Sequence, residues 1–63
     1  MNNMNKIQEL RLKKGMTALE LAKKAGITNI SLSLFENGKR KPSKLSLYKI
    51  AKVLEVEPSD LQE

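Results

Sequence analysis

The strongest constraint on the fold is a very short connection between two expected helices in the first half of the chain. Thr17 and Glu20 form the pattern of a capping box, which predicts a helix from there to residue 25. Only residues 26–28 (Gly-Ile-Thr) separate it from a second helix, for which Thr28 is the expected N-cap. A turn this short, with a glycine free to adopt a left-handed conformation, makes two helices cross at a steep angle. Apolar residues at helical spacing predict one core shared by both helices around the small Ala22: Leu21, Ala25, Ile27, Leu32 and Phe35.

The rest of the chain is divided in the same way by caps and stops. Gly15 ends a first helix, Ser43 caps a longer helix that carries apolar residues to Leu54, and Pro58 begins a short last one. We expect five helices, over residues 5–14, 17–25, 28–36, 43–54 and 58–62. No segment alternates polar and apolar residues as a strand does. A chain of 63 residues is one domain at most, so we predict a single compact all-α domain over residues 1–63.

Composition argues against several classes of function. The chain has no cysteine and no histidine, which removes disulfides, the usual zinc ligands and the commonest general base. We therefore expect no enzyme, no metal and no cofactor, and no motif indicates a small-molecule ligand. The longest apolar run is far below the about 20 residues that span a bilayer, and the first residues lack the pattern of a signal peptide. We expect a cytoplasmic protein without a membrane partner.

The distribution of charge points to a polyanion. Twelve Lys and Arg residues stand against seven Asp and Glu residues, which gives a formal charge of +5. The excess is concentrated in residues 39–44, whereas residues 53–63 contain four acids and no base. A basic segment beside an acidic one suggests that one face binds a polyanion such as nucleic acid. A basic surface that serves only solubility is the alternative.

A set of short motifs is spread along most of the chain. They are IQELR (7–11), KG (14–15), ELA (20–22), GIT (26–28), ENGK (36–39), PS (42–43) and, after Leu47, KIAK (49–52). With these motifs the chain resembles the Cro/repressor family of phage and bacterial helix-turn-helix domains, also called Xre-type or lambda-repressor-like, from about Lys6 to Leu61. The resemblance implies a compact five-helix domain that binds a double-stranded DNA operator, usually as a dimer. It therefore implies a sequence-specific transcriptional regulator, most simply a repressor.

The resemblance also implies which residues meet the DNA, with the helix over residues 28–37 in the major groove. The residues that would face the bases are Asn29, Ile30, Ser33 and Leu34. The residues that would contact phosphates are Arg11, Thr17, Thr28, Ser31, Asn37, Lys39, Arg40 and Lys41. The amide of Asn29 can pair with adenine, although an Asn at a helix start can also simply cap it. Glu36 would hold the guanidinium of Arg11 in orientation; a plain surface ion pair is the alternative.

The chain departs from the family pattern in three respects. Ala18 stands where a Gln is usual, so a phosphate contact and a brace for the reading helix are missing. Ile30 and Leu34 are apolar where polar or charged readers are frequent; they can pack on thymine methyl groups or contact a protein. Glu55 stands where a Gly commonly ends a helix. A second hypothesis is therefore a protein-interaction module on the same fold, such as an antitoxin or the binding half of a longer regulator.

For a homodimer, the candidate interface is the acidic and apolar C-terminal end of the chain. Its proposed contacts are Val56, Pro58 and Leu61, beside Val53 and Leu54. The alternative is that this segment only closes the core. In a dimer the two reading helices should lie about 34 Å apart, which is one helical turn of B-DNA.

Overall fold

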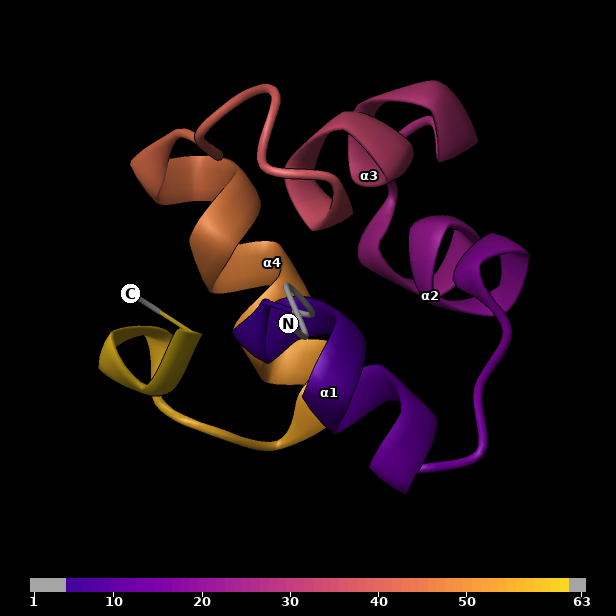
Figure 1. Cartoon of the computed structure of the whole chain (residues 1–63). Coiled ribbons are helices and arrows are strands. Elements are labelled where there is room, and N and C mark those ends of the chain that lie inside the picture. The colour runs from indigo at the N-terminus through magenta and orange to yellow at the C-terminus, as the bar shows by residue number, and fades with distance from the viewer. Residues whose placement is uncertain (1–4, 62–63) are drawn as a thin grey trace.

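The computed structural model describes residues 5–61 and is all-helical, as the sequence predicts. It contains the α-helices α1 (Lys6–Lys13), α2 (Ala18–Ala25), α3 (Asn29–Glu36) and α4 (Lys44–Leu54), followed by the 3-10 helix η1 (Pro58–Leu61). In Figure 1, α4 lies behind α1, with α2 and α3 on one side of this pair and η1 on the other. α4 contacts α1, α2 and η1, and α1 also contacts α3.

Each α-helix begins directly after a polar residue that caps it. The side-chain oxygens of Asn5, Thr17, Thr28 and Ser43 accept hydrogen bonds from backbone amides three residues later, at 3.0, 3.1, 3.0 and 3.2 Å. Thr17 also has the reciprocal bond of a capping box, because its amide donates to the carboxylate of Glu20 at 2.9 Å. The expected helices begin one residue early for this reason: the first residue of each range is the cap, which is not yet helical.

The core is built from the inner faces of all five segments. Its fully buried members include four large side chains that reach almost no solvent: Leu21, Leu32, Ile50 and Leu54. Ile7, Ala22, Ala25, Phe35, Leu47, Ala51 and Leu61 complete the cluster. Ile27, which the sequence also places in the core, is only half-buried and packs against its edge.

The expected short fifth helix over residues 58–62 begins at Pro58 as predicted, but it is not an α-helix, so the described residues form four α-helices and not five helices of one kind. The chain forms the four-residue 3-10 helix η1 there, and residue 62 lies outside the described part of the chain. The backbone amide of Asp60 donates to the carbonyl of Glu57 at 2.9 Å, which is the three-residue bond of a 3-10 helix. The carboxylate of Asp60 in turn accepts from the backbone amide of Glu57 at 3.0 Å. A segment this short closes with the tighter 3-10 hydrogen bonds, and it is held because Leu61 is buried in the core.

Candidate nucleic-acid interface

The turn between α2 and α3 fixes how α3 is presented. Gly26 ends α2 in the left-handed conformation, with φ +73°, and the amide of Ile27 donates to the carbonyl of Ala22 at 3.0 Å. Apart from Gly26 and its neighbours in the chain, no atom lies within 4 Å of the position that a Cβ on Gly26 would occupy, so glycine is favoured there by its backbone angle and not by lack of space. Ala22 is buried between the helices. The turn therefore directs α3 across α2 and leaves one side of α3 free of the rest of the domain.

The four predicted base readers lie on this free side of α3. Leu32 and Phe35 point into the core. On the outer side, Asn29, Ile30 and Ser33 are exposed, and Leu34 is half-buried. Ile30 is 75% exposed. The only ionisable residue of α3 is Glu36, which is buried, so the exposed surface of this helix carries no charge.

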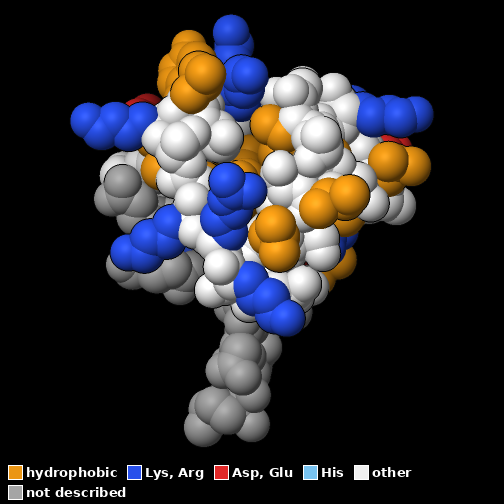
Figure 2. Space-filling model, turned by 90° about the horizontal axis from the view of Figure 1, so that it is seen from above, with side chains coloured by type: hydrophobic (Ala, Val, Ile, Leu, Met, Phe, Trp, Pro, Cys, Tyr) orange, Lys and Arg blue, Asp and Glu red, His pale blue; other side chains and the backbone are white. Residues whose placement is uncertain are grey.

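The basic loop that follows α3 is folded back against the helix end. Gly38 takes a left-handed backbone with φ +71°, and the amides of Lys39 and Arg40 both donate to the carbonyl of Leu34, at 3.0 and 3.3 Å. These amides are therefore occupied, and what the loop offers a ligand is the exposed side chains of Lys39, Arg40 and Lys41. Figure 2 looks onto the face made by α3 and this loop; Lys and Arg side chains are spread over it, apolar ones lie between them, and acidic ones appear only at its margin.

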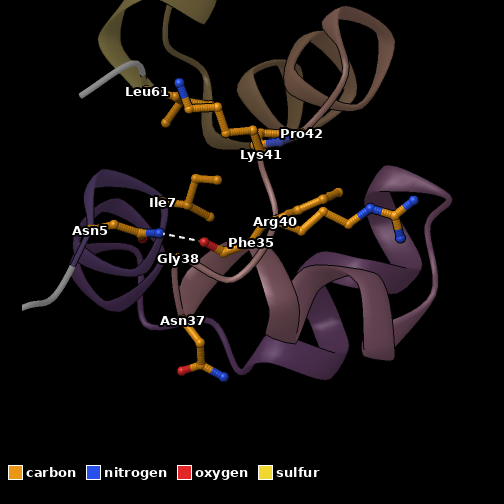
Figure 3. Close-up of a pocket in the computed structure, with 9 residues that line it drawn as sticks. All are labelled: Asn5, Ile7, Phe35, Asn37, Gly38, Arg40, Lys41, Pro42 and Leu61. Atoms are coloured by element: carbon orange, nitrogen blue, oxygen red, sulfur yellow. Dashed lines mark hydrogen bonds between the residues drawn. The ribbon is translucent and has the colours of Figure 1, made fainter.

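Two shallow hollows flank the basic loop. The larger, of about 410 Å³, lies between the loop, the start of α1 and Leu61, and at its rim the amide nitrogen of Asn5 donates to the carbonyl of Phe35 at 2.6 Å. Figure 3 shows the side chains of Arg40 and Lys41 leaving the loop in different directions, Lys41 toward Leu61 and Arg40 away from it. Both residues line each hollow, but the charged ends of their side chains point apart.

The smaller hollow, of about 230 Å³, joins α3 to the start of α4. It brings together three predicted phosphate contacts, Ser31, Arg40 and Lys41, with two hydroxyls that the sequence analysis missed, Ser43 and Ser46. Ser43 is the N-cap of α4 and its hydroxyl also donates to Ser46 at 3.2 Å. The signal in the sequence is positional: an N-cap serine that follows a run of cations after a single proline places hydroxyls and helix amides beside positive charge.

Arg11 and Glu36 form a buried, two-pronged ion pair between α1 and α3. Nε of Arg11 lies 2.7 Å from Oε2 of Glu36, and its Nη2 donates to Oε1 at 3.1 Å. Its Nη1 donates to the carbonyl of Met16 at 2.8 Å, so all three guanidinium nitrogens are engaged within the protein. Arg11 is 8% exposed and Glu36 is 9% exposed. The alternative of a plain surface pair is therefore excluded, and the pair fixes the end of α3 against α1 and the residues before α2.

The remaining predicted phosphate contacts differ in whether their hydroxyl or amide group is available to bind a phosphate. The hydroxyl oxygen of Thr28 accepts from the Ser31 amide at 3.0 Å, which leaves its own proton available to an anion. Thr17 is less suited, because its hydroxyl lies 3.4 Å from the Glu20 carboxylate, which would repel a phosphate. The amide of exposed Asn37 lies 3.4 Å from the Ser33 hydroxyl, at the long limit of a hydrogen bond.

Two departures from the family pattern have a structural explanation. Ala18, in place of the usual Gln, is half-buried and packs against the core. Glu55 takes the left-handed conformation that a glycine would take at the end of α4, with φ 61°, although it has a side chain. Its carboxylate meets Nζ of Lys14 at 2.7 Å, and this hydrogen bond and the charge of Lys14 lower the pKa of Glu55 below its ordinary value of 4.5.

The residues predicted for the dimer interface differ in how deeply they are buried. Leu61 is 4% exposed and packs in the core, so it serves the alternative role of closing the fold. Val56 and Pro58 are half-buried and keep part of their surface exposed to solvent.

Within residues 5–61 no helix has the length and apolar character needed to cross a bilayer. The same residues contain no group of three or more acidic, His or Cys side chains suited to hold a metal ion.

The short left-handed turn, the exposed second helix and the basic loop beside it define a helix-turn-helix DNA-binding domain. Residues 7–61 match the family model described as helix-turn-helix, and the chain belongs to that family, in its Xre, lambda-repressor-like branch. It is the DNA-binding domain of a transcriptional regulator.

The names of similar proteins are consistent with this assignment. A protein of Archaeoglobus fulgidus named as an uncharacterized HTH-type transcriptional regulator is 45% identical over 56 residues, which are 89% of this chain and 80% of that protein. The restriction-modification controller protein C.AhdI of Aeromonas hydrophila has a TM-score of 0.86 at 32% identity, over 90% of this chain and 86% of that one. SinR of Bacillus subtilis, a master regulator for biofilm formation, has been solved in complex with DNA. Its structure has a TM-score of 0.85 at 36% identity, over 90% of this chain and 92% of that one.

Proposed function

We propose that this domain binds a specific double-stranded operator as a homodimer and represses the promoter that contains it. The observation that carries the proposal is the placement of an exposed, uncharged α3 beside exposed cations of the loop 39–41 on one face of the domain. Phosphate neutralisation by such cations supplies affinity that does not depend on sequence. Side chains of a helix in the major groove then supply the choice of bases.

The residues of this face divide into two groups by chemistry. The proposed base readers are the outer residues of α3, which are Asn29, Ile30, Ser33 and Leu34. The proposed phosphate contacts are the cations and hydroxyls around them, which are Thr28, Ser31, Asn37, Lys39, Arg40, Lys41, Ser43 and Ser46. We assign Arg11 a positioning role instead, because its guanidinium is buried and each of its three nitrogens already donates a hydrogen bond within the protein.

Salt dependence tests the phosphate part of the proposal. A duplex selected in vitro from random sequence should lose affinity steeply between low and high salt. Lys39→Ala should reduce the slope of log affinity against log salt by about one and weaken all sequences alike. Lys52→Ala is the matched control, since it removes the same charge from the last turn of α4, at the end remote from the loop. An affinity that does not change with salt would refute the proposal.

Base preference tests the reading part. Asn29→Ala should bind nonspecific DNA as well as the parent chain does, but lose about 1–3 kcal/mol of discrimination at one base pair in each half-site. The hydroxyl that caps α3 belongs to Thr28, so the substitution at the exposed Asn29 leaves the cap in place. Uniform loss over all sequences, with unchanged preference, would move the reading surface away from Asn29.

The proposed dimer is formed by the outer surface around Val53, Val56 and Pro58, with Leu61 closing the core behind it. Val53 and Val56 pack on the core with one side and are half-exposed with the other. Sedimentation of the chain alone should show a dimer, and two chains should bind a duplex of two half-sites cooperatively. Val56→Glu should give a monomer that binds a single half-site as before but binds the two half-sites independently; a parent chain that is monomeric and binds without cooperativity would refute the proposed dimer.

A protein-interaction module on the same fold is the second candidate, and α4 carries the observation that favours it. Leu45 is 62% exposed and Tyr48 is 55% exposed, and they lie three residues apart on one side of this helix, away from the core. This function predicts that a folded chain selects no duplex from a random pool. The same selection experiment therefore decides between the two candidates.

A further inference from the structure

The exposed face of α3 presents an apolar side chain where a DNA-reading helix first meets the bases. Ile30 is the second residue of α3 and is 75% exposed, the largest exposure among the big apolar side chains described in residues 5–61. Leu34 lies one turn further along the same side and is half-buried. The fold makes no use of the outer surface of Ile30, because the core is closed by Leu32 and Phe35 on the opposite side.

The same face lacks the groups that usually read guanine. Arg and Lys contact the two acceptors of guanine more often than any other side chains do, and α3 contains neither. Its one ionisable residue, Glu36, is bound to Arg11 inside the protein. Two polar groups remain beside Ile30. The amide of Asn29 is suited to adenine, and the hydroxyl of Ser33 can form a hydrogen bond with any of the bases.

Only one apolar group stands on a base edge in the major groove of ordinary DNA, the 5-methyl group of thymine. An isoleucine at the start of a reading helix therefore has a single kind of apolar partner there. We infer that the domain recognises thymine through contact between Ile30 and this 5-methyl group, within an A·T-containing half-site. The inference rests on the proposed function and specifies what that function reads.

Deoxyuridine provides the test, because it differs from thymidine only by the missing methyl group. In the selected duplex, each thymine of a half-site is replaced in turn by uracil, and binding is measured at constant salt. One position should weaken binding by about fourfold, the factor that corresponds to one methyl group withdrawn from water. Ile30→Ala should bind the thymine and uracil duplexes equally at that position.

A matched control separates this contact from general effects of uracil on the duplex. Leu45→Ala removes another exposed apolar side chain of the same size, 62% exposed on α4, and should keep the full uracil penalty. Circular dichroism should show that both variants fold, since neither side chain belongs to the core.

Three outcomes would be decisive. The penalty at one position, abolished by Ile30→Ala and kept by Leu45→Ala, supports methyl recognition. Sequence-specific binding with no uracil penalty, or with a penalty that persists in Ile30→Ala, overturns it while DNA binding stands. A folded chain that selects no duplex overturns the proposed function itself and this inference with it.

Discussion

Replacing Arg11 by Met should come close to unfolding the domain, although one side chain out of 63 is changed. The substitution keeps an unbranched apolar chain but removes both bonds to the Glu36 carboxylate, at 2.7 and 3.1 Å, and the bond to the Met16 carbonyl, at 2.8 Å. The carboxylate is then left buried without its cation. Breaking a buried pair in this way costs about 3–5 kcal/mol.

This cost is large against the whole stability of so small a domain. At about 0.05–0.15 kcal/mol per residue, a chain of this length has a free energy of unfolding of about 3–9 kcal/mol. Arg11→Met should therefore lower the midpoint of urea unfolding, followed by circular dichroism, by a third of its value or more. The double variant Arg11→Met/Glu36→Leu should recover most of the loss, because no unpaired charge remains and the volumes are similar.

The same variants test the positioning role of the pair. If Arg11 braces α3 and touches no phosphate, the folded double variant should bind a selected duplex with an unchanged salt slope. A slope reduced by about one would show that Arg11 contacts a phosphate. Single variants that lose less than about 1 kcal/mol, or a double variant as unstable as the sum of both singles, would refute the argument from burial.

Two further predictions concern the turn at Gly26 and the ion pair between Lys14 and Glu55. Gly26→Ala should destabilise the domain by about 1–2 kcal/mol, because its left-handed φ strains any side chain even in open space; an unchanged urea midpoint would contradict this. The lowered pKa of Glu55 means that its pairing with Lys14 stabilises fully above the ordinary value of 4.5 and is lost as the pH falls through the lowered one. The melting temperature should thus fall more steeply on acidification for the parent chain than for Lys14→Met, by a small amount that added salt reduces; parallel curves would refute it.

The positions of the helices could be predicted from the sequence because the signals are local. Asn5, Thr17, Thr28 and Ser43 each cap a helix through a bond to an amide three residues away, so their neighbours in sequence suffice. The last segment is the exception. Its pattern predicted a short helix, and the structure forms the four-residue 3-10 helix η1, which the burial of Leu61 in the core holds in place.

The outer face of α3 could be predicted from the sequence, but the surroundings of the basic loop could not. The spacing of Leu32 and Phe35 already places Asn29, Ile30 and Ser33 on the outer side of α3. The sequence contained nothing to show that the amides of the loop 39–41 are partly occupied by the Leu34 carbonyl. It also did not show that Ser43 and Ser46 lie with Ser31 around one hollow, since these residues belong to different helices.

By itself, the sequence determined the helix-turn-helix: a capped helix, a glycine turn, a second capped helix and a basic loop, each specified by contacts within a few residues. Tertiary structure alone decided that the Arg11 guanidinium is buried with its partner 25 residues away, and that Lys14 pairs with Glu55, 41 residues apart. Burial and charge pairing between distant residues depend on how the helices pack. No pattern of neighbours records whether a paired cation faces solvent, where it can bind a phosphate, or the interior, where it can only hold the reading helix in place.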